Sequence, residues 1–149
     1  MNTFYSPKLE LYINIQMENG IIKRLMFSRA PMGKEAKSRV IEDLRRYLNG
    51  EAIDFSKYNI SLSSFTQFER AVLLETRKIP FGVTICYSEL AKLVGTSAVR
   101  AVGNALAKNP VPLLIPCHRV IRKNGSLGGY TAGVNVKQKL LEIEGIRGG

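Results

Sequence analysis

The chain has 149 residues, of which 45% are hydrophobic and 23% are charged, and it carries a formal net charge of +10 at pH 7. This length suffices for one ordinary domain or two small ones whose core folds without disulfides. No apolar stretch approaches the roughly twenty residues that span a membrane, and the first residues lack the basic and apolar regions of a signal peptide. We therefore expect a cytoplasmic protein with no membrane partner.

The chain contains two cysteines, Cys86 and Cys117, and one histidine, His118. In a reducing compartment both cysteines are expected to be free thiols. One histidine and two cysteines cannot supply the four ligands of a usual zinc site unless carboxylates are recruited. We therefore expect no metal and no other cofactor.

The positive charge is concentrated in the second part of the chain. Residues 66–149 carry 12 Lys and Arg against 5 Glu, whereas residues 1–65 carry 10 basic against 7 acidic residues. This distribution favours a polyanionic partner, although some proteins are basic only because charge keeps them soluble.

Residues 1–62 predict a small α/β unit. Apolar positions within 9–15 and 21–27 flank an Asn19-Gly20 pair, which tolerates the positive φ angles of a type I′ turn, and they predict an antiparallel hairpin. Apolar residues at helical spacing within 40–48 predict a helix that a following Asn-Gly pair ends. No nucleophile or phosphate-binding loop stands out, so we expect this unit to be a scaffold. A serine-rich linker at 61–64 divides it from a second unit, residues 63–149.

Residues 63–149 predict a mainly helical unit. A capping box beginning at Ser64 predicts a first helix, which residues 79–82 end. The apolar face of this helix is expected to contain Phe65, Phe68 and Val72. Two short helical segments, 88–94 and 97–108, then follow at helix-turn-helix spacing, which alone is a weak signal because many helix pairs share it.

The second helix of this pair has two different faces. The face expected to pack contains Val99, Val102 and Leu106. The opposite face, which could contact DNA, contains Arg100, Ala101, Asn104 and Lys108. An ordinary amphipathic surface helix would show the same periodicity, so the pattern leaves both interpretations open.

The clearest chemical signal is Cys117-His118-Arg119, which follows Pro116 and the apolar run 111–115. A thiol reacts as its thiolate, and a neighbouring base or positive charge makes the thiolate accessible at neutral pH. His118 and Arg119 are expected to supply these. An isolated Cys-His pair, however, more often marks a cysteine buried as a small hydrophobic residue.

The full stretch from Asn109 to Ile121, NPVPLLIPCHRVI, resembles the active-site signature of the O6-alkylguanine-DNA alkyltransferases. The resemblance covers about residues 65–145 well and the N-terminal unit poorly. It implies an RNase H-like α/β N-terminal unit followed by a mainly helical, winged-helix-like C-terminal unit with a helix-turn-helix. It also implies a monomer that acts on double-stranded DNA carrying alkylated guanine.

The activity that the resemblance implies is direct-reversal repair by a methylated-DNA–protein-cysteine methyltransferase. The alkyl group of O6-alkylguanine is transferred irreversibly to Cys117, once per protein molecule, after the nucleotide has been flipped out of the duplex. Whether O4-alkylthymine is a second substrate, and which alkyl groups are preferred, stays open.

The resemblance assigns the reactive residues one by one. Cys117 corresponds to the alkyl acceptor, His118 to the residue that deprotonates it through a water, and Glu144 to the carboxylate that orients the histidine. Tyr87 corresponds to the tyrosine that protonates N3 of the departing guanine, and Asn109 to the asparagine that braces the turn before the cysteine.

The DNA and guanine contacts are assigned in the same way. Arg100 corresponds to the arginine that occupies the space of the flipped nucleotide, on a helix that enters the minor groove. The other expected DNA contacts are Ala101, Gly103, Asn104, Lys108 and Arg119. The expected substrate-binding residues are Tyr87, Val120, Tyr130 and Thr131. Family members commonly carry serine where Thr131 stands, so we expect the backbone contact there to be retained.

The position of Glu144 has support beyond the resemblance. The last helix is expected to bury Val136, Leu140 and Ile143, and Glu144 lies near the same face. A carboxylate just before the helix-ending Gly145 is disfavoured by the helix dipole, so Glu144 is expected to have a buried partner. A solvated carboxylate near the C-terminus is the alternative.

Three other functions are compatible with parts of the sequence. A non-reactive lesion-binding relative would lack the acceptor cysteine, which is present here as Cys117. A helix-turn-helix regulator with a sensing thiol would be expected to dimerise on two half-sites, and no extra dimerisation segment is evident. A Cys-His hydrolase would have to release its covalent intermediate with water, which a thioether does not permit.

Overall fold

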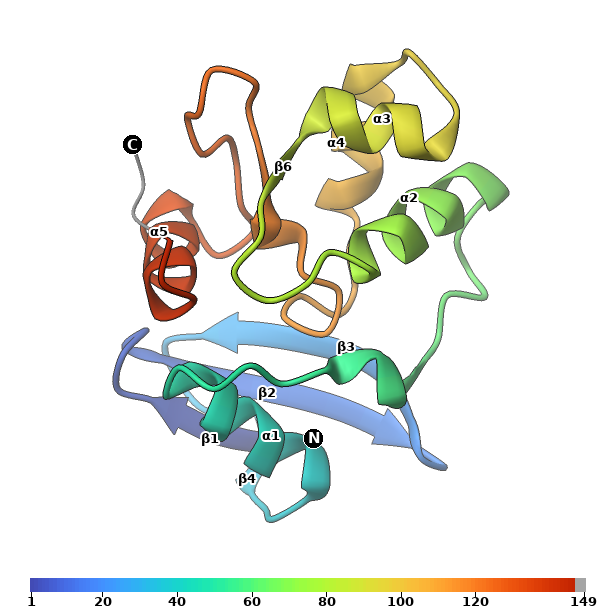
Figure 1. The fold of residues 1–149 in the computed structure, drawn as a ribbon. Helices are drawn as coiled ribbons and strands as arrows, with labels where there is room; N and C mark the ends of the chain where they lie inside the picture. Colours follow the sequence, from blue (N-terminus) through green and yellow to red (C-terminus); the bar gives the residue numbers. More distant parts are fainter. Residues whose placement is uncertain (147–149) are drawn as a thin grey trace.

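The computed structural model describes residues 1–146. Its first part is a sheet with one α-helix, and its second part carries four α-helices (Figure 1). The expected order, an α/β unit followed by a mainly helical unit, is confirmed.

The sheet is mixed, with strand order β4-β1-β2-β3-β5. Strands β1 (Asn2–Ser6), β2 (Leu11–Glu18) and β3 (Ile21–Ser28) are antiparallel, and the short strands β4 (Lys34–Glu35) and β5 (Asn59–Ile60) pair in parallel with β1 and β3. The predicted hairpin is β2–β3. Its turn residues Asn19 and Gly20 have φ angles of 52° and 77°, as a type I′ turn requires.

Helix α1 (Arg39–Leu48) confirms the helix predicted within 40–48. Ser38 caps its first turn by accepting a hydrogen bond from the N–H of Ile41, and Asn49 caps its last. The face it buries carries Val40, Ile41, Leu44, Tyr47 and Leu48. The 3₁₀ turn η1 (Phe55–Lys57) brings the Phe55 ring to 5.9 Å from the Tyr47 ring.

The helices of the second part are α2 (Gln67–Arg77), α3 (Tyr87–Val94), α4 (Val99–Ala107) and α5 (Val134–Ile143). Strand β6 (Ile85–Cys86) pairs in parallel with β7 (Val120–Ile121). Gly95, with a φ of 90°, ends α3 in the left-handed conformation and turns the chain into α4. The expected pair of short helices is confirmed.

Two predicted details of these helices are wrong. The capping box of α2 is formed by Thr66 and Glu69 rather than by Ser64, so Phe65 precedes the helix and only Val72 of the three expected apolar residues is fully buried. The sequence contains two overlapping capping-box patterns, one from Ser64 to Gln67 and one from Thr66 to Glu69. Only the second forms both reciprocal hydrogen bonds between side chain and backbone N–H. In α4, Val99 is exposed, whereas Val102 and Leu106 are buried as predicted.

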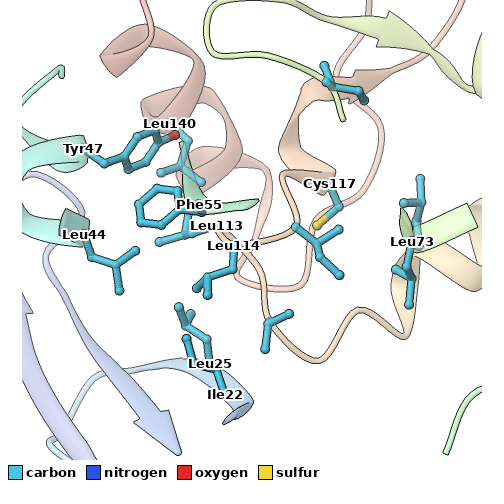
Figure 2. Packing of buried hydrophobic residues seen from close by; sticks show 14 of the residues in the cluster. Ile22, Leu25, Leu44, Tyr47, Phe55, Leu73, Leu113, Leu114, Cys117 and Leu140 are labelled. Carbon is cyan, nitrogen blue, oxygen red and sulfur yellow. The ribbon is translucent and has the colours of Figure 1, made fainter. Parts of the chain in front are cut away.

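The core is continuous between the two parts of the chain. All residues of the segment 111–120 are buried. Figure 2 shows Leu113 and Leu114 of this segment above Ile22 and Leu25 of the sheet, and the N–H of Leu25 donates to the carbonyl of Pro110 at 2.9 Å. The segment that leads to Cys117 is therefore buried and both packed against and hydrogen-bonded to the sheet, which fixes its position.

Within residues 1–146, no helix has both the length and the apolar composition needed to cross a membrane.

Candidate active site around Cys117

Cys117 follows a tight turn that Asn109 holds in place. The Asn109 Oδ1 accepts from the N–H of Val111 at 3.0 Å, and its Nδ2 donates to the carbonyl of Ile115 at 2.9 Å and to the Cys117 Sγ at 3.2 Å. Within the turn, Leu113 has a φ of 76°, a left-handed conformation that costs a non-glycine residue about 1–2 kcal/mol. The Asn109 amide thus stabilises a strained turn and contacts the sulfur that the turn presents. These contacts agree with the expected bracing role.

Cys117 lies at the wall of a cleft. The residue is 8% exposed and lines a cavity of about 810 Å³, within the roughly 300–1,000 Å³ typical of small-molecule sites. Of the residues expected from the sequence, the cleft is lined by Tyr87, Arg100, Gly103, Asn104, Cys117, Tyr130 and Thr131. Arg122, which the sequence analysis did not identify, also lines it.

At rest the Cys117 thiol is protonated rather than held as an anion. Burial raises its pKa, and the hydrogen bond from Asn109 and the charge of Lys137 only partly oppose this effect. The positive charge that lowers the pKa of Cys117 comes from Lys137 and not from Arg119, as the sequence had led us to expect. A base must remove the proton when the reaction occurs.

His118 is held by two partners on one of its ring nitrogens. Its Nε2 lies 2.5 Å from Glu144 Oε2 and 3.1 Å from the Tyr47 hydroxyl, and that hydroxyl donates to the same Glu144 oxygen at 2.5 Å. His118 and Glu144 are fully buried side chains. The structure therefore confirms that Glu144 has a buried partner and contacts the histidine.

The environment of His118 favours its neutral form. Burial lowers its pKa, Glu144 raises it, and Arg119 and Lys137 lower it further, with a net decrease. Because Nε2 faces the Glu144 carboxylate, which only accepts, we assign the ring proton to Nε2. The other nitrogen, Nδ1, is buried and has no hydrogen-bond partner among the described residues. A neutral imidazole with a free Nδ1 is competent to accept a proton.

Glu144 is the anion of the cluster. Its Oε1 accepts from Arg119 Nε at 2.8 Å and from the N–H of Gly82 at 2.9 Å, while its Oε2 accepts from His118 and Tyr47. Burial raises its pKa, but the hydrogen bonds and charges of His118 and Arg119 outweigh burial and lower it to about 2. Four donors thus make a buried carboxylate tolerable.

Arg119 does not face DNA, contrary to the prediction. It is 5% exposed, its Nη1 donates to the carbonyl of Ile79 at 2.6 Å, and its Nε binds Glu144. It lines a separate cavity of about 780 Å³, which does not include Cys117. Successive residues of the 3₁₀ turn η2 (Cys117–Arg119) point in different directions, so adjacency in sequence did not bring the guanidinium to the sulfur.

Lys137 is a buried cation that the sequence analysis missed. Its Nζ donates to the carbonyls of Val120 at 2.8 Å and Gly129 at 3.2 Å, and also to that of Leu127. Burial lowers its pKa from 10.5 to about 8, while the nearby Cys117 raises it. A signal was present, because a lysine four residues before the buried Leu141 lies on the inward face of the last helix.

Tyr87 lies between α4 and the loop that follows β7. Two glycines approach its side chain closely. A methyl group placed on Gly128 would lie 3.1 Å from the Tyr87 hydroxyl, and one placed on Gly103 would lie 4.0 Å from the Tyr87 ring. Burial and Cys117 raise the pKa of Tyr87, so its phenol keeps its proton at neutral pH. Gly128 has a φ of 76°, a second reason for glycine at this position.

The other predicted residues divide into two groups. Arg100, Asn104 and Lys108 are exposed on α4, and Thr131 is exposed on the loop; Ala101 and Gly103 are half-buried. Val120 is fully buried, does not line the cleft, and its carbonyl accepts from Lys137.

The prediction that the last helix buries Ile143 is only partly right, since Ile143 is half-buried and Leu141 is buried.

A cysteine that shares a cleft with the exposed Arg100 and Asn104 of one helix, and that precedes a histidine paired with a carboxylate, is the arrangement of a cysteine-dependent group-transfer protein. Residues 67–146 match the family described as 6-O-methylguanine DNA methyltransferase, DNA binding domain. A methylated-DNA–protein-cysteine methyltransferase of Archaeoglobus fulgidus is 41% identical over 92% of this chain and 95% of that protein. One of Methanothermobacter thermautotrophicus is 42% identical over 85% of this chain and 70% of that protein. The chain therefore belongs to the methylated-DNA–protein-cysteine methyltransferases, a family of direct-reversal DNA repair enzymes.

Solved structures agree with this assignment. The Mycobacterium tuberculosis OGT in complex with DNA superposes with a TM-score of 0.83 at 30% identity, covering 97% of this chain and 92% of that one. The O6-methylguanine-DNA methyltransferase of Pyrococcus kodakaraensis gives 0.75 at 27% identity, covering 97% and 98%. The predicted family is confirmed.

Proposed function

We propose that this chain repairs DNA by moving the alkyl group of O6-alkylguanine onto Cys117, once per protein molecule. The observation that carries the proposal is that Cys117 lines the same cleft as Arg100 and Asn104 of α4, while the next residue in the chain, His118, is hydrogen-bonded to Glu144. A thiol of a residue that lines a cleft, next in the chain to a neutral histidine, can act as a nucleophile when its proton is removed.

The transfer conserves atoms and charge. The thiol proton passes to Nδ1 of His118 through a water, and the sulfur electron pair attacks the alkyl carbon. The bond between that carbon and O6 breaks, its electron pair moves into the guanine ring, and the Tyr87 phenol donates a proton to N3. The imidazolium returns its proton through water to the tyrosinate, so the products are a thioether and neutral guanine. The free Nδ1 and the protonated Tyr87 support these roles.

DNA is proposed to bind along α4, with the helix in the minor groove. Arg100 and Asn104 are exposed and line the same cleft as the sulfur, which supports a role for Arg100 in filling the space of a flipped nucleotide. Lys108 pairs with Glu69 at 2.5 Å in the free protein, so a phosphate contact would exchange one partner for another. The half-buried Ala101 and Gly103 would allow close approach of the helix to the groove.

The guanine edge is proposed to contact the loop 128–131 and the backbone near Cys117. Thr131 and Tyr130 line the cleft, and the Tyr130 hydroxyl is buried without a partner among the described residues. Val120 can contribute only through its carbonyl, which has a second lone pair besides the one directed at Lys137. O4-alkylthymine would enter the same cleft, and its repair is part of the proposal.

We also infer an RNase H-like unit over residues 1–62 and a winged-helix-like unit over residues 63–149. The β2–β3 hairpin with α1 supports the first, and α3–α4 with the β6–β7 pair supports the second. A monomeric state and a cytoplasmic location remain predictions from the sequence.

The proposed function is tested by mixing the protein with duplex DNA that carries one O6-methylguanine. Mass spectrometry of the digested protein should show one methyl group on Cys117, with unmodified guanine restored in the DNA. Cys117→Ser should abolish the transfer, and the matched control Cys86→Ser should retain it. Binding without transfer would support a lesion-binding protein instead, and more than one repaired duplex per protein would reject the single-turnover mechanism.

A further inference from the structure

The N-terminal unit supplies one polar atom to the buried cluster behind Cys117. Tyr47 lies on the buried face of α1, is 1% exposed, and its hydroxyl reaches both Glu144 and His118. Figure 2 shows its ring extending from α1 past Phe55 toward Leu140 of α5. Tyr47 is 71 residues before His118 in the chain, so this contact depends on the packing of one part against the other.

We propose that Tyr47 is a positioning residue for alkyl transfer. Its hydroxyl donates to the same Glu144 oxygen that binds His118. This contact keeps the imidazole in the orientation and tautomer that present Nδ1 to the cysteine proton. The inference rests on the proposed function and adds a residue from the unit that the sequence marked only as scaffold.

The geometry determines what the hydroxyl can do. Oε2 of Glu144 accepts two short hydrogen bonds, each 2.5 Å long, from Tyr47 and from His118. Because the phenol has a single proton and donates it to Glu144, its oxygen is left as an acceptor toward Nε2, 3.1 Å away. Two acceptors then face Nε2, and both require the ring proton to be there.

The Tyr47 ring is itself held rigidly. Phe55 and Phe81 pack edge-on against it, with centroid distances of 5.9 and 6.0 Å, and the His118 ring lies 6.3 Å away. A rigid phenol can fix the orientation of the imidazole, whereas a mobile one could not. The same packing means that phenylalanine would fill the space and remove only the hydroxyl.

The charge on the cluster keeps the Tyr47 phenol protonated. Burial and the Glu144 charge raise the pKa of Tyr47 well above its usual value, so it stays a donor throughout the reaction. Five other ionisable groups surround His118. Lys137 lies on α5 and Glu144 at its C-terminal end, Cys117 and Arg119 belong to the same 3₁₀ turn as His118, and Tyr130 lies in the loop before α5. Loss of the Tyr47 hydrogen bond would leave more negative charge on Glu144, which would stabilise the imidazolium and raise the pKa of His118.

The test compares Tyr47→Phe with Tyr58→Phe. Tyr58 is a matched control, because its hydroxyl also donates to a buried carboxylate, that of Asp43, at 2.5 Å, but among the described residues it makes no hydrogen bond to His118 or Glu144. With saturating O6-methylguanine duplex, the single-turnover rate at pH 7 should fall roughly tenfold for Tyr47→Phe, with unchanged DNA affinity. The acid limb of its pH–rate profile should move up by about one unit. Tyr58→Phe should match the wild type in rate and profile.

A second readout does not need activity. Since His118 is the only histidine, nitrogen NMR of the tag-free protein reports its tautomer and titration without ambiguity. The wild type should show the proton on Nε2 and a downfield Tyr47 hydroxyl resonance with cross-relaxation to the imidazole protons. Tyr47→Phe should raise the pH at which the ring titrates and admit the other tautomer.

The outcomes separate this inference from the proposed function. If Tyr47→Phe is folded and its rate, pH profile and tautomer equal those of the wild type, the positioning role is wrong even though repair occurs. If the wild type fails to transfer a methyl group, the proposed function fails, while NMR still decides whether Tyr47 controls the tautomer. If the variant does not fold, a wild-type spectrum with Nδ1 protonated or no Tyr47 cross-relaxation overturns the inference.

Discussion

Replacing Glu144 by glutamine should destabilise the fold by about 3 kcal/mol at pH 7, because four hydrogen-bond donors surround its carboxylate. Two of them, from Arg119 and Gly82, face Oε1, and two, from Tyr47 and His118, face Oε2. A glutamine must turn its NH₂ group toward one of these pairs. That NH₂ group can only donate, so the two donors that face it lose their acceptor.

Two independent magnitudes agree. The carboxyl pKa is lowered from 4.5 to about 2, and a shift of about 2.5 units corresponds to about 3 kcal/mol of stabilisation of the ionised form. Removing one partner of a buried ion pair typically costs about 3–5 kcal/mol. For a chain of this length, a loss of about 3 kcal/mol lowers Tm by roughly 10 °C.

The pH dependence provides the sharper test. Because the folded-state pKa of Glu144 is lowered, its contribution is fully present above pH 4.5 and is lost as the pH falls from 4.5 toward 2. Urea unfolding from pH 7 to pH 3 should therefore show a difference between wild type and Glu144→Gln that shrinks below pH 4.5. Glu10→Gln, which removes a surface pair with Lys139, is the control and should change stability little. A difference that stays constant down to pH 3 would refute the argument.

Three further variants test separate parts of the site. Asn109→Ala should lower the free energy of unfolding by about 2–3 kcal/mol in urea, because the strained turn loses three hydrogen bonds, and a loss under 0.5 kcal/mol would show that the turn needs no brace. Arg100→Ala, at an exposed position, should keep Tm but slow methyl transfer from duplex far more than from the free alkylated base; equal slowing on both would remove the proposed role in base flipping. Lys137→Met should shift the alkylation of Cys117 by iodoacetamide to higher pH, because the cation opposes the burial of the thiolate, and an unshifted profile would exclude this electrostatic effect.

Local chemistry made much of the fold predictable. The Asn19-Gly20 turn joins β2 to β3, and Gly95, in the left-handed conformation, ends α3 before α4. The hairpin and the helix pair appear as predicted, because the backbone conformation at these turns depends on the turn residues themselves. Strands β1, β4 and β5 were not predicted. Strands β4 and β5 have two residues each, lie at the edges of the sheet, and are defined by parallel pairing with β1 and β3, which are distant in sequence. Strand β1 pairs with the neighbouring β2, and the hairpin signal used for β2–β3 did not extend to it.

The site was predictable only where the motif itself carries it. Cys117 and His118 are adjacent in sequence, and the resemblance supplied Glu144, but side-chain direction was not available from either. Arg119 was therefore assigned to DNA, although it binds Glu144. Tyr47 was noted only as an apolar position of its helix. Its buried hydroxyl requires a partner, but which partner depends on how the two parts of the chain pack.

The charge states of the buried groups explain why the site can hold a reactive cysteine without ionising it in advance. At rest Glu144 is the anion, Arg119 and Lys137 are cations, and the thiol and imidazole are neutral. Moving the thiol proton to His118 leaves the net charge of the cluster unchanged and places the new imidazolium against Glu144 and the new thiolate in the field of Lys137. An ion pair formed within a prepared set of charges costs far less than a lone buried thiolate would. The thiol can therefore remain neutral until its proton is transferred to His118, and in the proposed reaction this transfer accompanies displacement at the alkyl carbon.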